Sequence, residues 1–245
     1  MEQVMEYAIE ATPRRATTLS VLAAAGADPA ECKAVWFGFP QAEFVARDRF
    51  EDELEVSASA LRTFGEGDCM ADALLSVVTE LRDACECTCT FGHEGAFQLM
   101  AVLGDGCQKK GQQTDTALLR DLAPAMRDFA TCEEGRAMGR AVLQALDLFP
   151  DEIEPHFAKK QCPTGGCAAF KTFHVLVSKC TGCGACLDAC EDGAIMGKPK
   201  FVHVVDQAKC TQCGRCLEAC LEGAVVRAGA KKPKTPPRPI PVKRK

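Results

Sequence analysis

Aromatic residues are scarce in this chain of 245 residues, which contains one tryptophan and one tyrosine. The formal net charge is −5, and 26% of the residues are charged. Proteins that bind nucleic acids commonly stack bases on aromatic side chains or present a broad basic groove. The composition therefore gives little reason to expect a nucleic-acid-binding protein.

The sequence also lacks a basic and then apolar leader, since it opens with Met1, Glu2 and Gln3, and it has no apolar run long enough to span a membrane. Cysteine, in contrast, is abundant, with 17 residues. Without a leader, so many thiols argue against a secreted disulfide scaffold and for metal ligands in a reducing compartment. We therefore expect a cytoplasmic protein with no membrane span and, at 47% hydrophobic residues, with true hydrophobic cores.

Basic residues gather at the C-terminal end of the chain. Residues 229–245 contain seven lysines and arginines together with five prolines. Such a segment buries too little apolar surface to offset its ordering entropy, and proline favours an extended conformation. We expect a disordered basic tail that keeps the protein in solution or docks on an acidic partner.

The first part of the chain has the pattern of a small α+β unit. Strand-like runs occupy residues 4–11 and 33–39, and a short helical run at 19–25 ends at a glycine-containing turn. Nothing catalytic is visible there. Cys32 and Trp36 are expected to be packing residues and not ligands.

From Cys69 onward the apolar residues recur at steps of three and four, which is typical of helices. Asp68 is expected to cap the first helix. Further helical stretches are predicted at residues 96–103, 117–129 and 138–149, which together suggest a helical bundle. Pro124 should kink the third helix, and Pro150 should close the fourth.

The last third of the chain contains an internal duplication, because residues 179–195 match residues 209–225 at 11 of 17 positions. Each copy carries four cysteines separated by two, two and three residues. A tight loop with this spacing can give three thiolates to one cubane, while the fourth comes from elsewhere. Zinc would normally show separated cysteine pairs. The duplication therefore predicts two [4Fe-4S] clusters.

This spacing resembles that of bacterial two-cluster ferredoxins, in which the fourth cysteine of each run serves the other cluster. The resemblance implies that cluster one is held by Cys180, Cys183, Cys186 and Cys220, and cluster two by Cys210, Cys213, Cys216 and Cys190. The glycines Gly182, Gly184 and Gly214 should let backbone amides approach the sulfurs. Ferredoxins usually have proline after the last cysteine, where this chain has Glu191 and Leu221. We expect ligation to survive and the charge of Glu191 to disfavour reduction of cluster two.

A second resemblance covers most of the remaining chain. It is carried by Cys69 and Met70 with the helix after them, by the cysteine cluster at residues 85–89, by the sequence His93, Glu94, Gly95, and by Cys132 with the segment at 139–143. These features resemble the C-terminal half of the flavin-binding subunit of respiratory complex I. Relatives with an appended ferredoxin domain, as in bifurcating or NAD(P)-linked hydrogenases and formate dehydrogenases, are more similar still.

In that family a soluble-ligand-binding β-grasp domain precedes the helical domain, and residues 19–39 with 48–55 are similar to it. The flavin and NADH site lies in a larger N-terminal domain with a glycine-rich loop, and no such loop precedes residue 65 here. The resemblance therefore implies a truncated homologue with no FMN on this chain.

The family's helical domain holds a further cluster, and the candidates for it here are Cys85, Cys87, Cys89 and Cys132, with His93 as an alternative ligand. Only Cys89 coincides with the family's spacing. The site is therefore either a third [4Fe-4S] cluster after local rearrangement or a decayed site of buried thiols.

Between the helical and ferredoxin parts, His156, Cys162 and Cys167 form a pattern that zinc would accept. Related hydrogenase subunits carry a similar linker, and the resemblance implies a structural zinc with Cys69 as candidate fourth ligand. The alternative is a turn with two free thiols. His174 and His203 are expected to be surface or packing residues, and Cys107 has no assigned role.

Together these patterns predict an α+β protein with a small β-grasp domain, a short helical bundle and a two-cluster bacterial ferredoxin-like domain. The predicted boundaries are 1–66 for the β-grasp-like domain, 67–158 for the helical domain, 159–170 for a cysteine-containing linker, 171–228 for the ferredoxin domain and 229–245 for the tail.

The predicted function is that of an electron-transfer subunit in a multisubunit NAD(P)-linked oxidoreductase. Its partners would be a flavin and NAD(P)H-binding subunit and further iron-sulfur, hydrogenase or dehydrogenase subunits. We predict no catalytic residue and no activity of the chain alone. The alternatives are an NADH dehydrogenase-type subunit with bound flavin, and a scaffold in which the clusters are structural.

Overall fold

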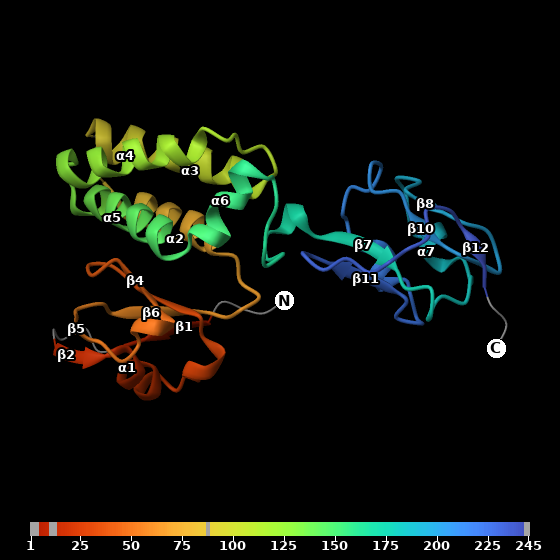
Figure 1. Ribbon diagram of the computed structural model, residues 1–245, viewed down its shortest axis with the longest axis horizontal. Helices are drawn as coiled ribbons and strands as arrows, with labels where there is room; N and C mark the ends of the chain where they lie inside the picture. The colour runs from red at the N-terminus through yellow and green to blue at the C-terminus, as the bar shows by residue number, and fades with distance from the viewer. Residues whose placement is uncertain (1–4, 10–13, 87–88, 243–245) are drawn as a thin grey trace. The chain divides into compact units, whose positions relative to one another are not determined.

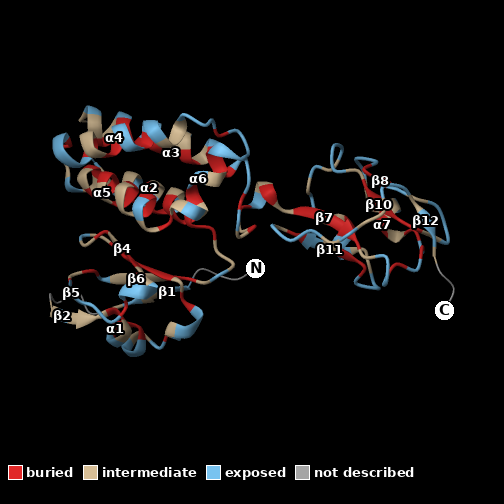
Figure 2. Ribbon diagram, in the orientation of Figure 1, coloured by how far each residue is buried: buried red, intermediate tan, exposed pale blue. Residues whose placement is uncertain are grey.

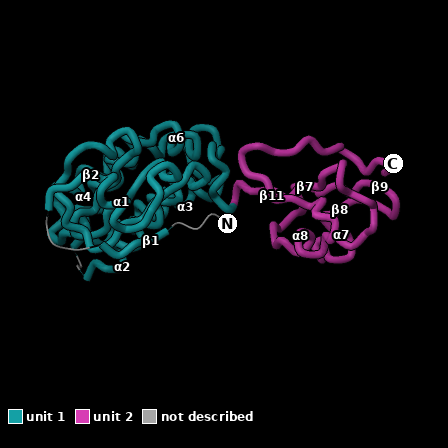
Figure 3. Tube along the Cα trace, turned by 90° about the horizontal axis from the view of Figure 1, so that it is seen from below, with its two compact units in different colours: residues 1–168 teal, residues 169–245 magenta. Residues whose placement is uncertain are grey.

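The computed structural model describes residues 5–9, 14–86 and 89–242, and the chain divides into two compact units, residues 1–168 and 169–245 (Figure 3). Both units mix helices with small sheets (Figure 1), which confirms the predicted α+β class. Among the described residues, no helix combines the length and the apolar character that a membrane crossing requires.

Unit 1 begins with a four-stranded antiparallel sheet in the order β1-β6-β3-β4. Its strands are β1 (Met5–Ala8), β3 (Ala34–Phe37), β4 (Glu43–Ala46) and β6 (Ala60–Phe64). A separate two-stranded sheet pairs β2 (Arg14–Thr17) with β5 (Glu53–Val56). The short 3₁₀ helices are η1 (Pro29–Glu31) and η2 (Arg47–Arg49). Residues 10–13, at the end of the first predicted strand, lie outside the described part.

The four-stranded sheet is covered on both faces. On one face, helix α1 (Thr18–Ala25) contributes Val21 and Leu22 to a core with Val35 and Phe37. On the other face, the Phe44 ring meets Phe149 of the helical region at 6.2 Å between centroids. The sheet therefore lies between α1 and the helices (Figure 1).

Within the described residues, the helical region contains five helices in place of the four predicted. They are α2 (Met70–Ala84), α3 (Thr90–Cys107), α4 (Asp115–Phe129), α5 (Glu133–Leu148) and α6 (Pro150–Ala158). Each of them contains buried residues, which are red in Figure 2. Pro150 is the first residue of α6, a position where proline loses no helical hydrogen bond. Helix α5 ends at Leu148, just before Pro150, as predicted, but α6 itself was not predicted.

The start of α2 also differs from the prediction. The N-cap position is Cys69, and the Asp68 carboxylate instead accepts a hydrogen bond from the Gly65 N–H at 2.7 Å. The Met70 N–H, one of the free donors at the helix start, donates to the Glu152 carboxylate at 3.2 Å. A side chain from α6 thus satisfies the donor that Asp68 was expected to satisfy.

Unit 2 has pairs of short strands around two short helices, α7 (Ala185–Asp188) and α8 (Arg215–Glu218). The antiparallel pairs are β7 (Thr172–Val175) with β11 (Val225–Ala228), β8 (Ile195–Met196) with β10 (Val204–Val205), and β9 (Phe201–Val202) with β12 (Ile240–Pro241). The 3₁₀ helix η3 (Ala168–Phe170) precedes β7. Strand β7 is buried along its whole length (Figure 2).

The C-terminal segment does not follow the prediction of a disordered tail over its described part. Ile240 pairs with Val202, the Val242 N–H donates to the Lys200 carbonyl at 3.0 Å, and Val242 packs on the core of unit 2. These contacts involve the few apolar residues of the segment, which meet strand β9 and the core of unit 2. Residues 243–245 lie outside the described residues.

Candidate iron-sulfur and metal sites

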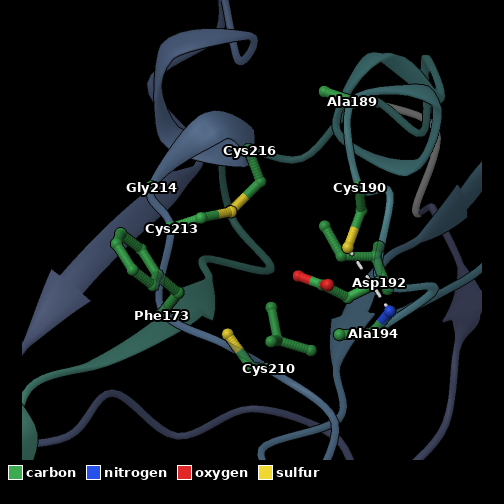
Figure 4. Close-up of a pocket in the computed structure, with 11 residues that line it drawn as sticks. Phe173, Ala189, Cys190, Asp192, Ala194, Cys210, Cys213, Gly214 and Cys216 are labelled. Atoms are coloured by element: carbon green, nitrogen blue, oxygen red, sulfur yellow. Dashed lines mark hydrogen bonds between the residues drawn. The ribbon is translucent and has the colours of Figure 1, made fainter.

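The eight cysteines of the duplication line two separate cavities in unit 2. The larger, with about 310 Å³ of space that includes open solvent, is lined by Cys190, Cys210, Cys213 and Cys216. The smaller, with about 280 Å³ counted in the same way, is lined by Cys180, Cys183, Cys186 and Cys220. Each cavity thus combines three cysteines of one copy with the fourth cysteine of the other. Figure 4 shows the four thiol side chains of the larger cavity around a common space.

The local backbone explains why each run can surround a cluster. Gly184 and Gly214 adopt φ angles of 94° and 85°, which side chains rarely tolerate, and they turn each loop into α7 or α8. The fourth cysteines are held in the same way in both copies. The Ala194 N–H donates to the Cys190 sulfur and the Ala224 N–H to the Cys220 sulfur, each at 3.3 Å. Backbone donors to thiolate sulfurs are among the groups that set cluster potentials.

One aromatic ring lines each cavity, and the two rings occupy equivalent positions. Phe173 lies seven residues before Cys180, and His203 lies seven residues before Cys210. Phe173 lines the larger cavity and His203 the smaller one. Each ring thus lines the cavity whose first three cysteines belong to the other copy, just as each fourth cysteine does. An alignment of the two copies that extended toward the N-terminus would have shown that Phe173 and His203 are equivalent.

His203 is a packing residue, as expected, and it also adjoins a candidate ligand. Its side chain is 1% exposed, and its Nδ1 lies 3.9 Å from the Cys180 sulfur. Burial lowers the pKa of His203, which favours the neutral ring. Gly197 makes room for it, since a Cβ there would lie 2.1 Å from the ring. His174, also buried, contacts the Thr172 hydroxyl at 2.7 Å.

Glu191 does not stand alone beside the larger cavity. Its carboxylate forms an ion pair with the Arg215 guanidinium. The sequence-based expectation treated Glu191 as an uncompensated charge. The pair joins residues from the two copies, so neither copy alone predicts it.

Unit 1 contains a buried group of four candidate zinc ligands. The ligand atoms of Cys69, His156, Cys162 and Cys167 all lie within 4.8 Å of one another, and all four residues are buried. His156 Nε2 lies 3.3 Å from the Cys69 sulfur and 3.4 Å from the Cys167 sulfur. A Cβ at Gly166 would lie 2.8 Å from the Cys69 backbone nitrogen, so glycine permits this approach.

The chemistry of these four residues suits zinc. Three cysteines and one histidine are a common tetrahedral donor set. His156 Nδ1 lies 2.8 Å from the Glu152 carbonyl, which fixes the ring so that Nε2 faces the sulfurs, as in many zinc sites. Hydrogen bonding with Cys162, then with Cys167, raises the pKa of Cys69, because these hydrogen bonds favour its protonated form. A bound cation would instead favour the thiolate form of the cysteines.

Cys107 lies at the edge of this group. Its sulfur is within 4.8 Å of the Cys167 sulfur and of an Asp72 carboxylate oxygen. The sequence alone gave no role to Cys107, and the contact comes from the last residue of α3 reaching the linker. It therefore adjoins the candidate zinc site without belonging to the four-residue group.

The structure brings together two of the candidate ligands for a third cluster, Cys85 and Cys132. The Cys85 and Cys132 sulfurs lie 3.3 Å apart, and Cys89 accepts a hydrogen bond from the Gly92 N–H at 3.1 Å. A Cβ at Gly135 would lie 2.9 Å from the Cys132 sulfur and 3.0 Å from the Gly92 Cα, so the starts of α3 and α5 meet here. Cys87 lies outside the described residues.

The alternative ligand His93 has another partner. Its Nδ1 lies 3.2 Å from a carboxylate oxygen of Glu94, and its ring packs on Phe97. The carboxylate of Glu134 also joins Cys85 and Cys132 in a group within 4.8 Å. These contacts favour the cysteines over His93 as the ligands of this site.

Comparison with known proteins agrees with the site geometry. Residues 70–156 match the family model of the NADH-ubiquinone oxidoreductase-F iron-sulfur binding region, and residues 179–224 match that of the 4Fe-4S dicluster domain. These two segments of the chain are therefore similar to an F-type iron-sulfur binding region and to a dicluster ferredoxin domain. The predicted resemblance is thereby confirmed, and [4Fe-4S]-binding domains are present.

Two curated relatives are similar in sequence to part of this chain. The chain is 32% identical over 138 residues to the NADP-reducing hydrogenase subunit HndC of Solidesulfovibrio fructosivorans, which covers 56% of this chain and 28% of the relative. It is 29% identical over 109 residues to the F subunit of the NADH-quinone oxidoreductase of Streptomyces coelicolor, which covers 44% of this chain and 24% of the relative. The chain thus spans about a quarter of the length of each.

A solved structure, the crystal structure of an NAD⁺-reducing [NiFe]-hydrogenase in the H₂-reduced state, is similar in fold. The TM-score is 0.52 at 15% sequence identity, over 58% of this chain and 26% of that one. At this identity the likeness shows a shared fold for the covered part.

Proposed function

We propose that this chain is an electron-transfer subunit whose ferredoxin unit holds two [4Fe-4S] clusters. The observation that carries the proposal is the division of the eight duplicated cysteines between two cavities, three from one copy and one from the other. That division suits two cubanes with crossed ligation. Each cubane would supply reversible one-electron chemistry. The chain itself would supply the thiolates, the backbone hydrogen bonds and a largely apolar lining.

The assignment of the ligands is part of the proposal. Cys180, Cys183, Cys186 and Cys220 would hold cluster one. Cys210, Cys213, Cys216 and Cys190 would hold cluster two. The matched hydrogen bonds to Cys190 and Cys220 support this assignment, because the two fourth cysteines are presented in the same way.

We further propose that unit 1 holds a third [4Fe-4S] cluster and a structural zinc. The family match over residues 70–156 and the contact between Cys85 and Cys132 support the third cluster, with Cys87 and Cys89 as its other ligands. The compact group of Cys69, His156, Cys162 and Cys167 supports the zinc.

Partners are proposed from the printed names of the relatives. HndC is a subunit of an NADP-reducing hydrogenase, and the Streptomyces relative is a subunit of an NADH-quinone oxidoreductase. By analogy, this chain would exchange electrons with a flavin and NAD(P)H-binding partner and with a further hydrogenase or dehydrogenase subunit. It would work in the cytoplasm, where a reducing environment keeps thiols available as ligands.

The direct test is an anaerobic preparation of the full chain, with iron and flavin content measured and the clusters followed by electron paramagnetic resonance. We expect signals of reduced [4Fe-4S] clusters after a low-potential donor is added, and reoxidation by the partner. In Cys213→Ala one ferredoxin cluster should be lost, whereas Cys32→Ala, which changes a core cysteine of unit 1, should keep all of them. A folded preparation that stays colourless and free of iron would overturn the proposal.

The same preparation separates the alternatives. Bound FMN would favour an NADH dehydrogenase-type subunit. Clusters that take up electrons from the donor but never pass them to a partner would favour a scaffold.

A further inference from the structure

The two copies of the duplication differ in charge at two equivalent places beside the clusters. Arg215 in the second copy stands where the first copy has Ala185. Glu191 in the first copy stands where the second copy has Leu221. Because the fourth cysteines are exchanged, both charged residues lie beside the larger cavity.

Arg215 contacts both a candidate ligand and the acidic residue. Its guanidinium forms the ion pair with Glu191, whose side chain is 77% exposed. The Arg215 side chain and its backbone N–H also form hydrogen bonds with the Cys213 sulfur. The guanidinium therefore contacts both this sulfur and the Glu191 carboxylate.

The smaller cavity has a neighbouring side chain of another kind. His203 Nδ1 lies 3.9 Å from the Cys180 sulfur, which is longer than a strong hydrogen bond. The remaining acidic residues balance between the copies, because Asp192 lines the larger cavity and Glu222, its equivalent, lines the smaller one.

We propose that Arg215 raises the reduction potential of the cluster held by Cys190, Cys210, Cys213 and Cys216 above that of the other ferredoxin cluster. Reduction adds negative charge to the cluster and its thiolates. A guanidinium that donates to Cys213 stabilises that added charge. Ala185 offers cluster one no such group. The electron that enters the ferredoxin unit therefore rests on cluster two. This inference depends on the proposed pair of clusters.

The test is a redox titration of the full chain under anaerobic conditions, followed by electron paramagnetic resonance, with iron counted in every variant. In the unmodified chain we expect two reduction steps for the ferredoxin unit. Arg215→Ala, which installs the residue of the first copy, should shift the higher step to more negative potential and leave the lower step in place. Arg215→Gln keeps a donor without the charge and should shift the same step by less.

The matched control is the reciprocal exchange Ala185→Arg, which should move the lower step to more positive potential. The inference is wrong if Arg215→Ala and Arg215→Gln keep their clusters and leave both steps unchanged. If Arg215→Ala fails to fold, the Ala185→Arg variant decides the question. The inference is also wrong if that variant keeps its iron and neither reduction step shifts. Absence of clusters from the unmodified chain would instead overturn the proposed function.

Discussion

Single residues decide how closely the elements of unit 1 approach one another, and glycine marks the tightest points. A Cβ at Gly139 of α5 would lie 2.5 Å from the Ala123 carbonyl oxygen and 2.6 Å from the Arg127 nitrogen of α4. Backbone atoms cannot swing aside as a side chain can. The contact between α4 and α5 therefore needs glycine at this position.

We predict that Gly139→Ala lowers the free energy of unfolding by about 1–3 kcal/mol, because the added methyl group forces the two helices apart. Urea denaturation followed by circular dichroism measures the effect. Gly104→Ala in α3 is the matched control, since nothing lies within 4 Å of its added Cβ. That change should stabilise the helix by up to about 1 kcal/mol. Equal destabilisation by both substitutions would contradict the close approach.

The charge of the single residue Glu191 should also affect the reduction potential of cluster two. We predict that Glu191→Gln raises the potential of cluster two, because it removes a negative charge while Arg215 stays beside Cys213. The shift should be smaller than that of Arg215→Ala, since the carboxylate is 77% exposed and is screened by solvent. A redox titration in which this variant leaves the potential unchanged or lowers it would count against the expected role of the carboxylate.

At the scale of elements, the start of α2 is joined to β3 and α6 by a partly buried ion pair. Lys33 Nζ, at the edge of β3, lies 2.7 Å from Glu152 Oε1 and donates to the Asp68 carbonyl. The two side chains are only 10% and 22% exposed. Glu152 also caps α2 through the Met70 N–H. One carboxylate thus holds three elements in register.

Lys33→Met should lower the free energy of unfolding by about 3 kcal/mol, because it leaves the Glu152 charge buried without its partner. Arg49→Met is the control, because its ion pair with Asp52 is more than half exposed and should contribute less than about 1 kcal/mol. Thermal and urea unfolding of both variants measure the difference. Similar losses of unfolding free energy in the two variants would show that the partly buried pair stabilises the fold no more than the exposed pair does.

The candidate zinc site joins elements in the same way, since its ligands come from the start of α2, from α6 and from the segment that follows α6. We predict about one zinc per chain, lost in Cys162→Ser, and a lower unfolding temperature when a chelator removes the metal. Elemental analysis measures the zinc content. Cys32→Ser, at a buried cysteine outside the group, should keep the metal. Zinc content that is the same in Cys162→Ser and in the unmodified chain would remove the zinc proposal.

At the scale of the whole molecule, the total number of clusters follows from the iron content. Two cubanes in unit 2 and one in unit 1 would give about twelve irons per chain, and two alone would give about eight. We predict about twelve, falling to about eight in Cys132→Ser. Iron that stays at about eight in both proteins would mean that Cys85 and Cys132 are buried thiols and not ligands.

Much of the molecule could be predicted from the sequence where the deciding pattern is local. The spacing of cysteines within each run, and the steps of three and four after Cys69, depend on neighbours along the chain. The α+β class and the resemblance to the F-type region are confirmed. Local composition did not predict helix α6, which begins at Pro150. It also did not predict that Ile240 pairs with β9.

The sequence by itself determined that each cysteine run can form a cluster-binding loop, because the geometry of such a loop is set within about a dozen neighbouring residues. Only the tertiary structure decided that Arg215 meets Glu191, that His203 lies beside Cys180, and that Lys33 joins Glu152. Those contacts join residues that are far apart along the chain. They form only when the copies and elements pack together, and no local spacing encodes them.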